Sequence, residues 1–278
     1  MPYSFRVTSP LATVTSALDV NVTATADIVF SVAVSAAHSP VQESLTMTVD
    51  GNAIGYHEIL AGGRTRLHRA PSVPPGLLRV EYSAQVAGPG ELLPHGEAEE
   101  ILYRRPSRYC DSDRLSQIAY SYFKGLSGAE LVEAVRDWVA TKILYTLGSS
   151  RGVDGALDTY LSRKGVCRDM GHLVVTFCRA MNVPARLVSV YAPGLAPMDF
   201  HAVAEVLLDG VWYVVDATGL APRQSMVRIA TGRDASDTAF MTTVAGRTQF
   251  KGLRVGAVVE GELPVDDPAT LVELGQSA

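Results

Sequence analysis

The first hundred residues are rich in valine and threonine and show little helical periodicity. Within them, residues 19–30, 44–49 and 77–86 are the clearest strand candidates. Glycine and proline mark turns between these strands, at Asp50-Gly51, Gly62-Gly63 and Pro74-Pro75-Gly76. Several short strands at close spacing predict an antiparallel β-sandwich, and we assign it to residues 1–104.

The pattern changes at about Arg104-Arg105-Pro106, after which apolar residues recur at helical spacing. This spacing is first seen in Leu115, Ile118, Ala119 and Tyr122. A second helix is expected after Ser127, which matches a capping box with Glu130. A shorter helix is expected after Asp154 and is predicted to end at Gly165. Residues 105–278 are therefore assigned to a second, mixed domain, and the fold class is α+β.

The clearest helix begins within residues 165–172. Its apolar residues fall at i, i+3, i+4, i+7, i+8 and i+11, at Met170, Leu173, Val174, Phe177, Cys178 and Met181. Asn182 and Pro184 then predict its end. Cys178 lies inside the buried stripe and is interpreted as a packing residue, whereas Cys167 lies at the N-terminal tip of the same face.

A thiol at the N-terminus of a helix is exposed to the positive end of the macrodipole, which favours the thiolate. Cys167 is therefore a candidate nucleophile, although a cysteine before a helix is more commonly structural. Asp169, in the first turn, suits the same dipole. His172 lies about 140° around the helix from Cys167, so a structural hydrogen bond is the expected role for this histidine.

Strands are expected again at residues 185–191, 201–208 and 211–216, with Asp209-Gly210 as a hairpin turn. If these two residues form the loop, Leu208 faces Val211. His201 and Asp216 then share one face of the hairpin as diagonal neighbours, about 7–8 Å apart. A three-residue loop would place them on opposite faces, so the prediction depends on the turn.

Cysteine, histidine and aspartate in this order match the nucleophile, the base and the orienting acid of covalent acyl chemistry. In this interpretation Cys167 attacks a carbonyl carbon, His201 moves the proton, and Asp216 fixes the imidazole tautomer. Water or an amine then resolves the thioester. The backbone N–H of Cys167 is a natural oxyanion donor. A core histidine and a turn aspartate are the structural alternatives for His201 and Asp216.

Composition excludes several other classes of function. The chain of 278 residues has 47% apolar residues and a net charge of −5, so no electrostatic footprint for nucleic acid is present. No apolar run reaches the length of a membrane helix, and the first residues do not resemble a secretion signal. Three cysteines give no paired disulfide framework, so we expect a cytoplasmic protein. Neither a metal nor a cofactor is expected.

His38, His57, His68 and His95 are isolated and are interpreted as solvent-facing or hydrogen-bonded.

Cys167, His201, Asp216 and the segments around them give the chain a resemblance to the transglutaminase-like superfamily of papain-like thiol enzymes. It looks like the bacterial members that carry a β-rich domain before the catalytic core. The resemblance covers roughly residues 105–255, in the segments Ser107-Arg108-Tyr109-Cys110, Asp113-Arg114-Leu115, Trp138, Tyr145, Gly165-Val166-Cys167-Arg168-Asp169, His172-Leu173, Phe200-His201-Ala202, Trp212-Tyr213-Val214-Val215-Asp216-Ala217-Thr218 and Gly232-Arg233-Asp234.

The resemblance implies a papain-like core in which a nucleophile helix packs on an antiparallel sheet, with Cys167, His201 and Asp216 as the catalytic triad. Papain has an oxyanion glutamine six residues before its cysteine, where this chain has Leu161. Tyr145 or Trp138 is the candidate donor instead, with core packing as the alternative for both.

The reaction implied is hydrolysis of an amide or peptide bond, as in a cysteine peptidase or amidase. Acyl transfer to an amine is one alternative, and an inactive binding module that has kept the fold is another. The expected partner is a protein, a peptide or a small amide, with neither nucleic acid nor membrane. The sequence indicates no oligomeric state.

Overall fold

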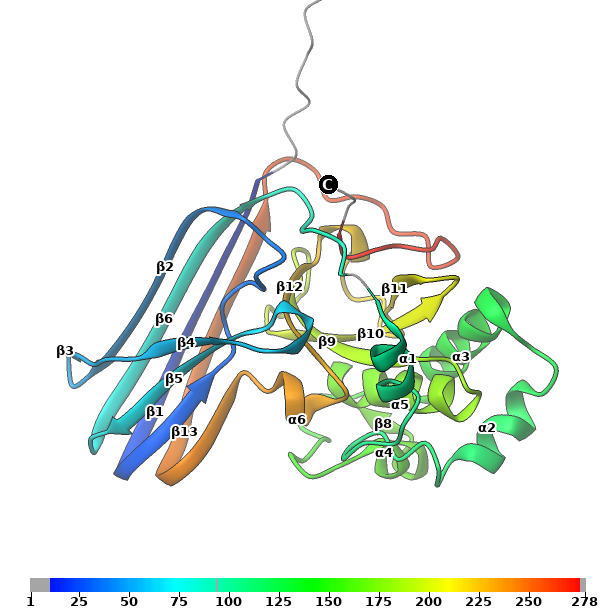
Figure 1. The fold of residues 1–278 in the computed structure, drawn as a ribbon, viewed down its shortest axis with the longest axis horizontal. Helices are drawn as coiled ribbons and strands as arrows, with labels where there is room; N and C mark the ends of the chain where they lie inside the picture. Colours follow the sequence, from blue (N-terminus) through cyan, green and yellow to red (C-terminus); the bar gives the residue numbers. More distant parts are fainter. Residues whose placement is uncertain (1–10, 94, 276–278) are drawn as a thin grey trace, which may run out of the picture.

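The computed structural model describes residues 11–93 and 95–275, which form two antiparallel sheets and a group of helices (Figure 1). The first sheet has seven strands, in the order β3-β2-β6-β1-β5-β4 with β13 paired to β1. These strands are β1 (Leu11–Phe30), β2 (Pro40–Val49), β3 (Asn52–Ala53), β4 (His57–Leu60), β5 (Arg66–Val73), β6 (Gly76–Ala87) and β13 (Met241–Val259).

The strands predicted in the first hundred residues are all present, each longer than expected at its N-terminal end. The turn between β2 and β3 uses Asp50 and Gly51, both of which have positive φ, at 49° and 82°. Glycine tolerates this left-handed region and aspartate is among the few other residues that enter it. The turn predictions at these positions are therefore confirmed.

The strands that the sequence predicts as a β-sandwich form a single curled sheet instead. The first half of β1 pairs with β6, from Leu11 to Val22, and its last residues pair with β5 instead. Between the two halves, the register against β13 shifts repeatedly. Such bulges bend and twist a strand, which turns the β4–β5 arm across the other strands. Ala70 of β5 and Met47 of β2 consequently lie in the same hydrophobic core.

Strand β13 returns to the first sheet after the second sheet is complete. It pairs with β1 from Phe30–Met241 at one end to Ala12–Val259 at the other. The predicted boundary assigned residues 241–259 to the catalytic core, so this part of the assignment is wrong. The reason is that a strand pattern records local geometry, whereas the choice of sheet depends on pairing with residues more than two hundred positions away. The rest of the division at residue 104 stays a prediction.

The second sheet has four antiparallel strands in the order β11-β10-β9-β12. They are β9 (Ala185–Tyr191), β10 (His201–Leu208), β11 (Val211–Val215) and β12 (Val227–Gly232). The helices are α1 (Glu97–Leu102), α2 (Ser116–Phe123), α3 (Gly128–Lys142), α4 (Ala156–Ser162), α5 (Cys167–Ala180) and α6 (Ala235–Thr238), and 3-10 turns occur at Gly62–Arg64 and Arg223–Ser225. No helix within the described ranges is both long and apolar enough to cross a membrane.

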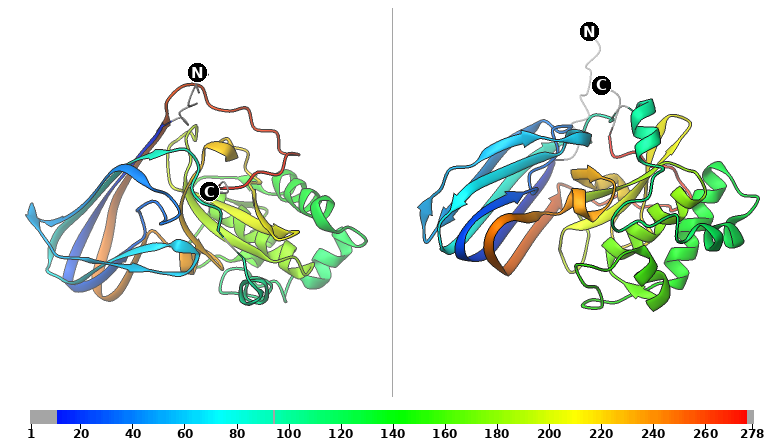
Figure 2. Two further views of the ribbon diagram at one scale, coloured as in Figure 1. Left: turned by 45° about the horizontal axis from the view of Figure 1, so that its top comes forward. Right: turned by 60° about the horizontal axis from the view of Figure 1, so that its bottom comes forward.

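Helix α5 is the centre of the second half of the chain. Its residues from Asp169 to Arg179 are all buried. On one side it packs on β9 and β10, and on the other side α2, α3 and α4 cover it (Figure 2). The predicted papain-like arrangement of a helix against an antiparallel sheet is thus confirmed.

Two details of the helices differ from the predictions. Helix α4 ends at Ser162, and not at Gly165; the next residue, Arg163, has a φ of 58° and caps it. The next residues instead form β8 (Lys164–Gly165), which pairs in parallel with β7 (Leu144–Tyr145). Ser127 does precede α3, but its side chain makes no capping hydrogen bond. Gly128 has a φ of 55° at the first helical position, and this distorts the turn in which the bond would form.

The two sheets share one hydrophobic core. Val227, Ile229 and Ala230 of β12 are buried among the side chains of the first sheet. At the same contact the hydroxyl of Tyr191 donates to the carbonyl of Val32 at 2.8 Å and is also hydrogen-bonded to Ser16 Oγ at 3.0 Å. Residues of both sheets therefore come together along the edge of β12.

Candidate active site

Cys167 is the first residue of α5, with Val166 as the N-cap. It is partly exposed, whereas the other cysteines of the chain, Cys110 and Cys178, are buried. Burial raises the pKa of both buried thiols to about 12, so neither forms a thiolate near neutral pH. Of the three cysteines, Cys167 is the one that a reagent or a substrate reaches.

His201 and Asp216 meet as the hairpin register predicts. Asp209 and Gly210 form a two-residue turn with positive φ at both positions, and Leu208 faces Val211. The imidazole Nε2 of His201 lies 2.9 Å from Asp216 Oδ2, and both side chains are buried. The sequence prediction that these two residues share one face of the hairpin is therefore correct.

The other carboxylate oxygen of Asp216 is also held. Oδ1 accepts the backbone N–H of Thr218 at 2.8 Å. Since Asp216 occupies Nε2 of His201, the ring nitrogen left over is Nδ1, which is buried and has no hydrogen bond to any of the described residues. The Cys167 side chain approaches the same imidazole.

The charge balance around His201 favours the imidazolium. Burial alone would lower the pKa of His201, but the carboxylate of Asp216 and the nearby Cys167 side chain outweigh burial and raise the pKa to about 10. The geometry therefore combines a thiol at a helix N-terminus with an imidazole that holds its proton through the neutral range.

Tyr145 lies next to Cys167. Burial and the charge of Cys167 raise the pKa of the Tyr145 phenol to about 12, while the backbone N–H of Cys167 opposes this shift. The phenol therefore stays protonated at neutral pH and keeps an O–H donor close to the N-terminus of α5.

Trp138 is a core-packing residue, the alternative to its predicted role as an oxyanion donor. Its indole stacks on Tyr160 and meets the edge of Phe177, which lies about three helical turns beyond Cys167 in α5. The suggestion that Trp138 supplies an oxyanion donor is therefore wrong. An aromatic residue at helical spacing can serve a site or a core equally well, and the direction of the helix decides between them.

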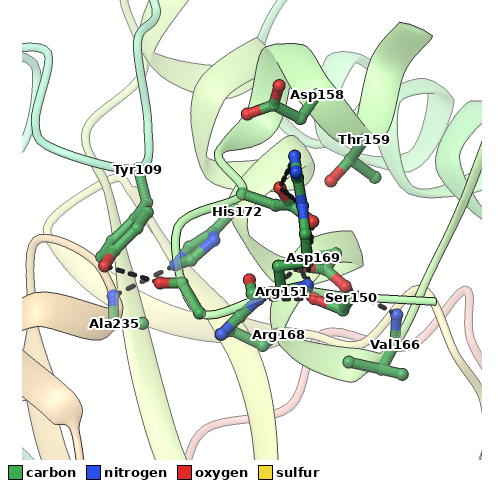
Figure 3. A network of polar contacts seen from close by, with 12 residues as sticks. Tyr109, Ser150, Arg151, Asp158, Thr159, Val166, Arg168, Asp169, His172 and Ala235 are labelled. Atoms are coloured by element: carbon green, nitrogen blue, oxygen red, sulfur yellow. Dashed lines mark hydrogen bonds and ion pairs between the residues drawn. The ribbon is translucent and has the colours of Figure 1, made fainter. Parts of the chain in front are cut away.

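Asp169 holds the N-terminus of α5 in place, a role that the sequence did not reveal beyond its fit to the helix dipole (Figure 3). Its Oδ2 accepts the backbone N–H of Val166 at 2.9 Å, and its Oδ1 accepts the hydroxyl of Ser150 at 2.8 Å. Arg168 forms an ion pair with the same carboxylate at 3.1 Å and donates to the carbonyl of Arg151. Asp169 thus ties the loop before α4 to the turn that carries Cys167.

His172 has the structural role that its position predicted. It is fully buried, stacks on Tyr109 at 5.3 Å, and accepts the backbone N–H of Ala235 through Nε2 at 3.1 Å (Figure 3). Burial lowers its pKa to about 4, so it stays neutral and cannot replace His201 as a partner of the thiol.

A cavity of about 410 Å³ opens beside Cys167 and His201. Its walls are mainly apolar and come from both sheets, including Leu187, Phe200, Ile229, Phe240 and Met241. Besides the imidazolium of His201, its charged residues are Arg168 and Asp199, and burial raises the pKa of Asp199. The contribution of β13 and of Ser31 at the end of β1 was missed, since no local pattern indicates that the first sheet borders the site. Within residues 11–93 and 95–275, no three histidine, cysteine or acidic side chains are grouped so as to hold a metal ion.

Comparisons with known proteins agree with this description of the second half of the chain. A model of the transglutaminase-like superfamily matches residues 119–217, a segment that contains Cys167, His201 and Asp216. A crystal structure of a "Putative Cysteine Protease from Cytophaga hutchinsonii" has 29% sequence identity and a TM-score of 0.84, with 93% of each chain covered.

A curated protein of Mycobacterium leprae, the uncharacterized protein ML0607, is 25% identical over 153 residues. That match spans 51% of this chain and about half, 53%, of the relative. The similarity to the Cytophaga structure thus extends through both sheets, whereas the superfamily match is confined to the part that carries the site.

Proposed function

We propose that the chain is a thiol enzyme that cleaves an amide or peptide bond through a thioester on Cys167, on the premise that residues 119–217 match the model of the transglutaminase-like superfamily. His201 acts as general acid and base, and Asp216 orients it. The observation that carries the proposal is the position of His201, which is bonded to Asp216 through Nε2 and approached by Cys167. The order of Cys167, His201 and Asp216 in the sequence and the approach of their side chains in the structure both support these roles.

In the first step Cys167 reacts as the thiolate, with its thiol proton carried by His201 as the imidazolium. The sulfur attacks the carbonyl carbon of the substrate, and the carbonyl oxygen gains a negative charge. The backbone N–H of Cys167 and the O–H of Tyr145 are the donors that would stabilise this oxyanion. The imidazolium of His201 then gives its proton to the leaving amine as the C–N bond breaks. A thioester remains on Cys167, and His201 becomes neutral.

In the second step the neutral His201 takes a proton from water while the water oxygen attacks the thioester. Loss of the sulfur restores Cys167 and releases a carboxylic acid. A primary amine in place of water gives a new amide, which is the transferase alternative. We favour hydrolysis, as in a cysteine peptidase or amidase, with water as the acceptor that is always present.

The cavity beside Cys167 supports a protein, a peptide or a small amide as the substrate. Leu187, Ile229 and Phe240 suit an apolar acyl group, and Asp199 offers a carboxyl group near the reacting atoms. A cytoplasmic site of action remains part of the proposal, on the evidence of an odd number of cysteines that are all free thiols.

A nitrophenyl ester tests the chemistry without knowledge of the natural substrate. The purified protein should release a burst of nitrophenolate, and mass spectrometry should find the acyl group on Cys167. Iodoacetamide should label Cys167 before Cys110 and Cys178. In Cys167→Ala the burst should disappear while the fold, followed by circular dichroism, is kept. Addition of a primary amine separates the two outcomes of the thioester, because transfer yields the amide and hydrolysis yields the acid.

An equal rate of labelling at the three cysteines, or a burst that persists in Cys167→Ala, would end the proposal. A folded wild-type protein that forms no thioester with any of several activated esters would favour the binding module instead.

A further inference from the structure

A second cavity lies on the face of the second sheet that is turned away from α5. It has a volume of about 300 Å³. All four strands of the sheet and two covering segments contribute to it, through Leu92, Leu93, His95, Arg186, Glu205, Gly210, Val211, Trp212, Arg228 and Leu274. None of these residues lines the cavity at Cys167, so the two spaces are separate.

Three charged side chains form the floor of this cavity. Arg186, Glu205 and Arg228 stand on three adjacent strands and are almost completely buried. Arg186 Nε donates to Glu205 Oε2 at 2.7 Å, and Arg228 Nη1 donates to the same oxygen at 2.9 Å. Two guanidinium groups therefore share one carboxylate, and the cluster carries one surplus positive charge.

The charge of the cluster is stable around neutral pH. Burial would raise the pKa of Glu205, but the two guanidinium groups outweigh burial and lower it to about 2. Arginine remains protonated even though burial lowers the pKa of Arg186. A change in the protonation of Glu205 therefore cannot remove the surplus positive charge. Only a bound anion or a rearrangement of the cluster can neutralise it.

Hydrogen-bond donors are also in excess. Arg186 Nη1 and Nη2, Arg228 Nε and Trp212 Nε1 are buried and have no acceptor among the described residues. The guanidinium carbon of Arg186 lies over the ring of Trp212, 3.8 Å from the ring centroid, and this contact restrains the guanidinium. Arginine and tryptophan side chains offer donors alone, so an acceptor has to come from another molecule.

We propose that this cavity binds a small organic monoanion through its carboxylate group. The surplus of one positive charge matches one carboxylate, and the free edge of a guanidinium suits the two carboxylate oxygens. Leu92, Val211 and Leu274 provide apolar surface for a short hydrocarbon body. An inorganic oxyanion would satisfy the donors and leave this apolar wall without a partner.

Fluorescence of Trp212 reports directly on the site. In a Trp138→Phe variant of the full chain, Trp212 is the single tryptophan, because the sequence contains two. Sodium butyrate, added at constant ionic strength, should change the emission of Trp212 in a saturable manner and raise the Tm. Butyramide, its neutral analogue, should have no such effect. Phosphate should bind more weakly than butyrate.

Substitutions of Arg186 and alkylation of Cys167 test which cavity gives the fluorescence response to butyrate. In the same Trp138→Phe background, Arg186→Met should abolish the response to butyrate, and Arg186→Lys should weaken binding about tenfold or more because the planar fork is lost. Arg79→Met, which removes an exposed arginine from the first sheet, is the matched control and should leave it unchanged. Alkylation of Cys167 should not alter the affinity, since that residue lies in the other cavity.

The absence of saturation by butyrate and by phosphate in the Trp138→Phe protein would overturn the site, and this measurement does not depend on whether an Arg186 variant folds. Saturation by phosphate alone would overturn the assignment to an organic carboxylate. A response that disappears when Cys167 is alkylated would show that butyrate binds in the catalytic cavity.

Discussion

His201 Nε2 and Asp216 Oδ2 lie 2.9 Å apart, in two strands joined by a two-residue turn. The backbone N–H of Thr218 holds the second oxygen of the same carboxylate. Asp216 is therefore fixed at both oxygens, and the imidazole is fixed by Asp216. This arrangement leaves Nδ1 of His201 for the thiol, and the predictions for the site start from it.

Asp216→Asn should lower the pKa of His201 from its value of about 10, because the largest favourable influence on the imidazolium is removed. The acylation rate of Cys167 by the nitrophenyl ester should fall by about 10⁴-fold, as expected when the orienting acid of a triad is replaced by an amide. NMR titration of the histidine rings, with His201→Gln to assign the signal, measures the pKa. An unchanged titration would contradict the prediction.

The raised pKa of His201 also has a consequence for stability. The folded-state pKa of about 10 exceeds the ordinary value of 6.5, so folding favours the protonated ring. This contribution is fully present below pH 6.5 and is lost as the pH rises through 10. The free energy of unfolding, from urea titrations across this window, should fall more steeply in the wild type than in Asp216→Asn. Equal slopes of the free energy of unfolding against pH in the two proteins would refute this prediction.

Tyr145→Phe should slow the acylation of Cys167 by about 10²-fold with little effect on KM, since the hydroxyl is expected to act on the developing oxyanion. Tyr160→Phe is a suitable control because its hydroxyl bonds to that of Tyr122 in the aromatic cluster. Stopped-flow measurement of the nitrophenolate burst gives both constants. If the two variants behave alike, Tyr145 is not an oxyanion donor.

Asp169→Ala should lower the free energy of unfolding by about 1–2 kcal/mol, because partly buried donors on Val166 and Ser150 lose a charged acceptor. It should also slow acylation of Cys167, whose turn these bonds hold. Asp158→Ala removes a similar bond, from Gly155 N–H, at the start of α4, where the carboxylate is exposed. That control should lose less stability and keep its acylation rate. Acylation at the wild-type rate in Asp169→Ala would remove the positioning role.

Tyr191→Phe should destabilise the protein by about 1–3 kcal/mol, since the buried carbonyl of Val32 loses its donor at the contact between the sheets. Tyr56→Phe removes a comparable bond to the carbonyl of Leu45, but this tyrosine is partly exposed and water can replace the hydroxyl. Its effect should be smaller. Urea unfolding of the two variants provides the comparison, and equal losses would argue against a special role for the contact.

The elements that carry the site could be predicted from the sequence because their determinants are local. The apolar spacing after Cys167 defines α5, and Asp209-Gly210 defines the turn that sets the register of the next two strands. From the turn alone, His201 and Asp216 are expected on one face of the hairpin. Neighbours along a helix or across a tight hairpin are fixed by the geometry of the backbone.

Only the tertiary structure decided which distant segments complete these elements. The pairing of β13 with β1, the bond between Ser150 and Asp169 and the sharing of Glu205 by two arginines all join residues that no local pattern connects. The same holds for Trp138, whose helical spacing suited both a core and a site. Such contacts depend on how whole sheets and helices pack, and a periodic pattern records which face of an element is buried but not the surface that covers it.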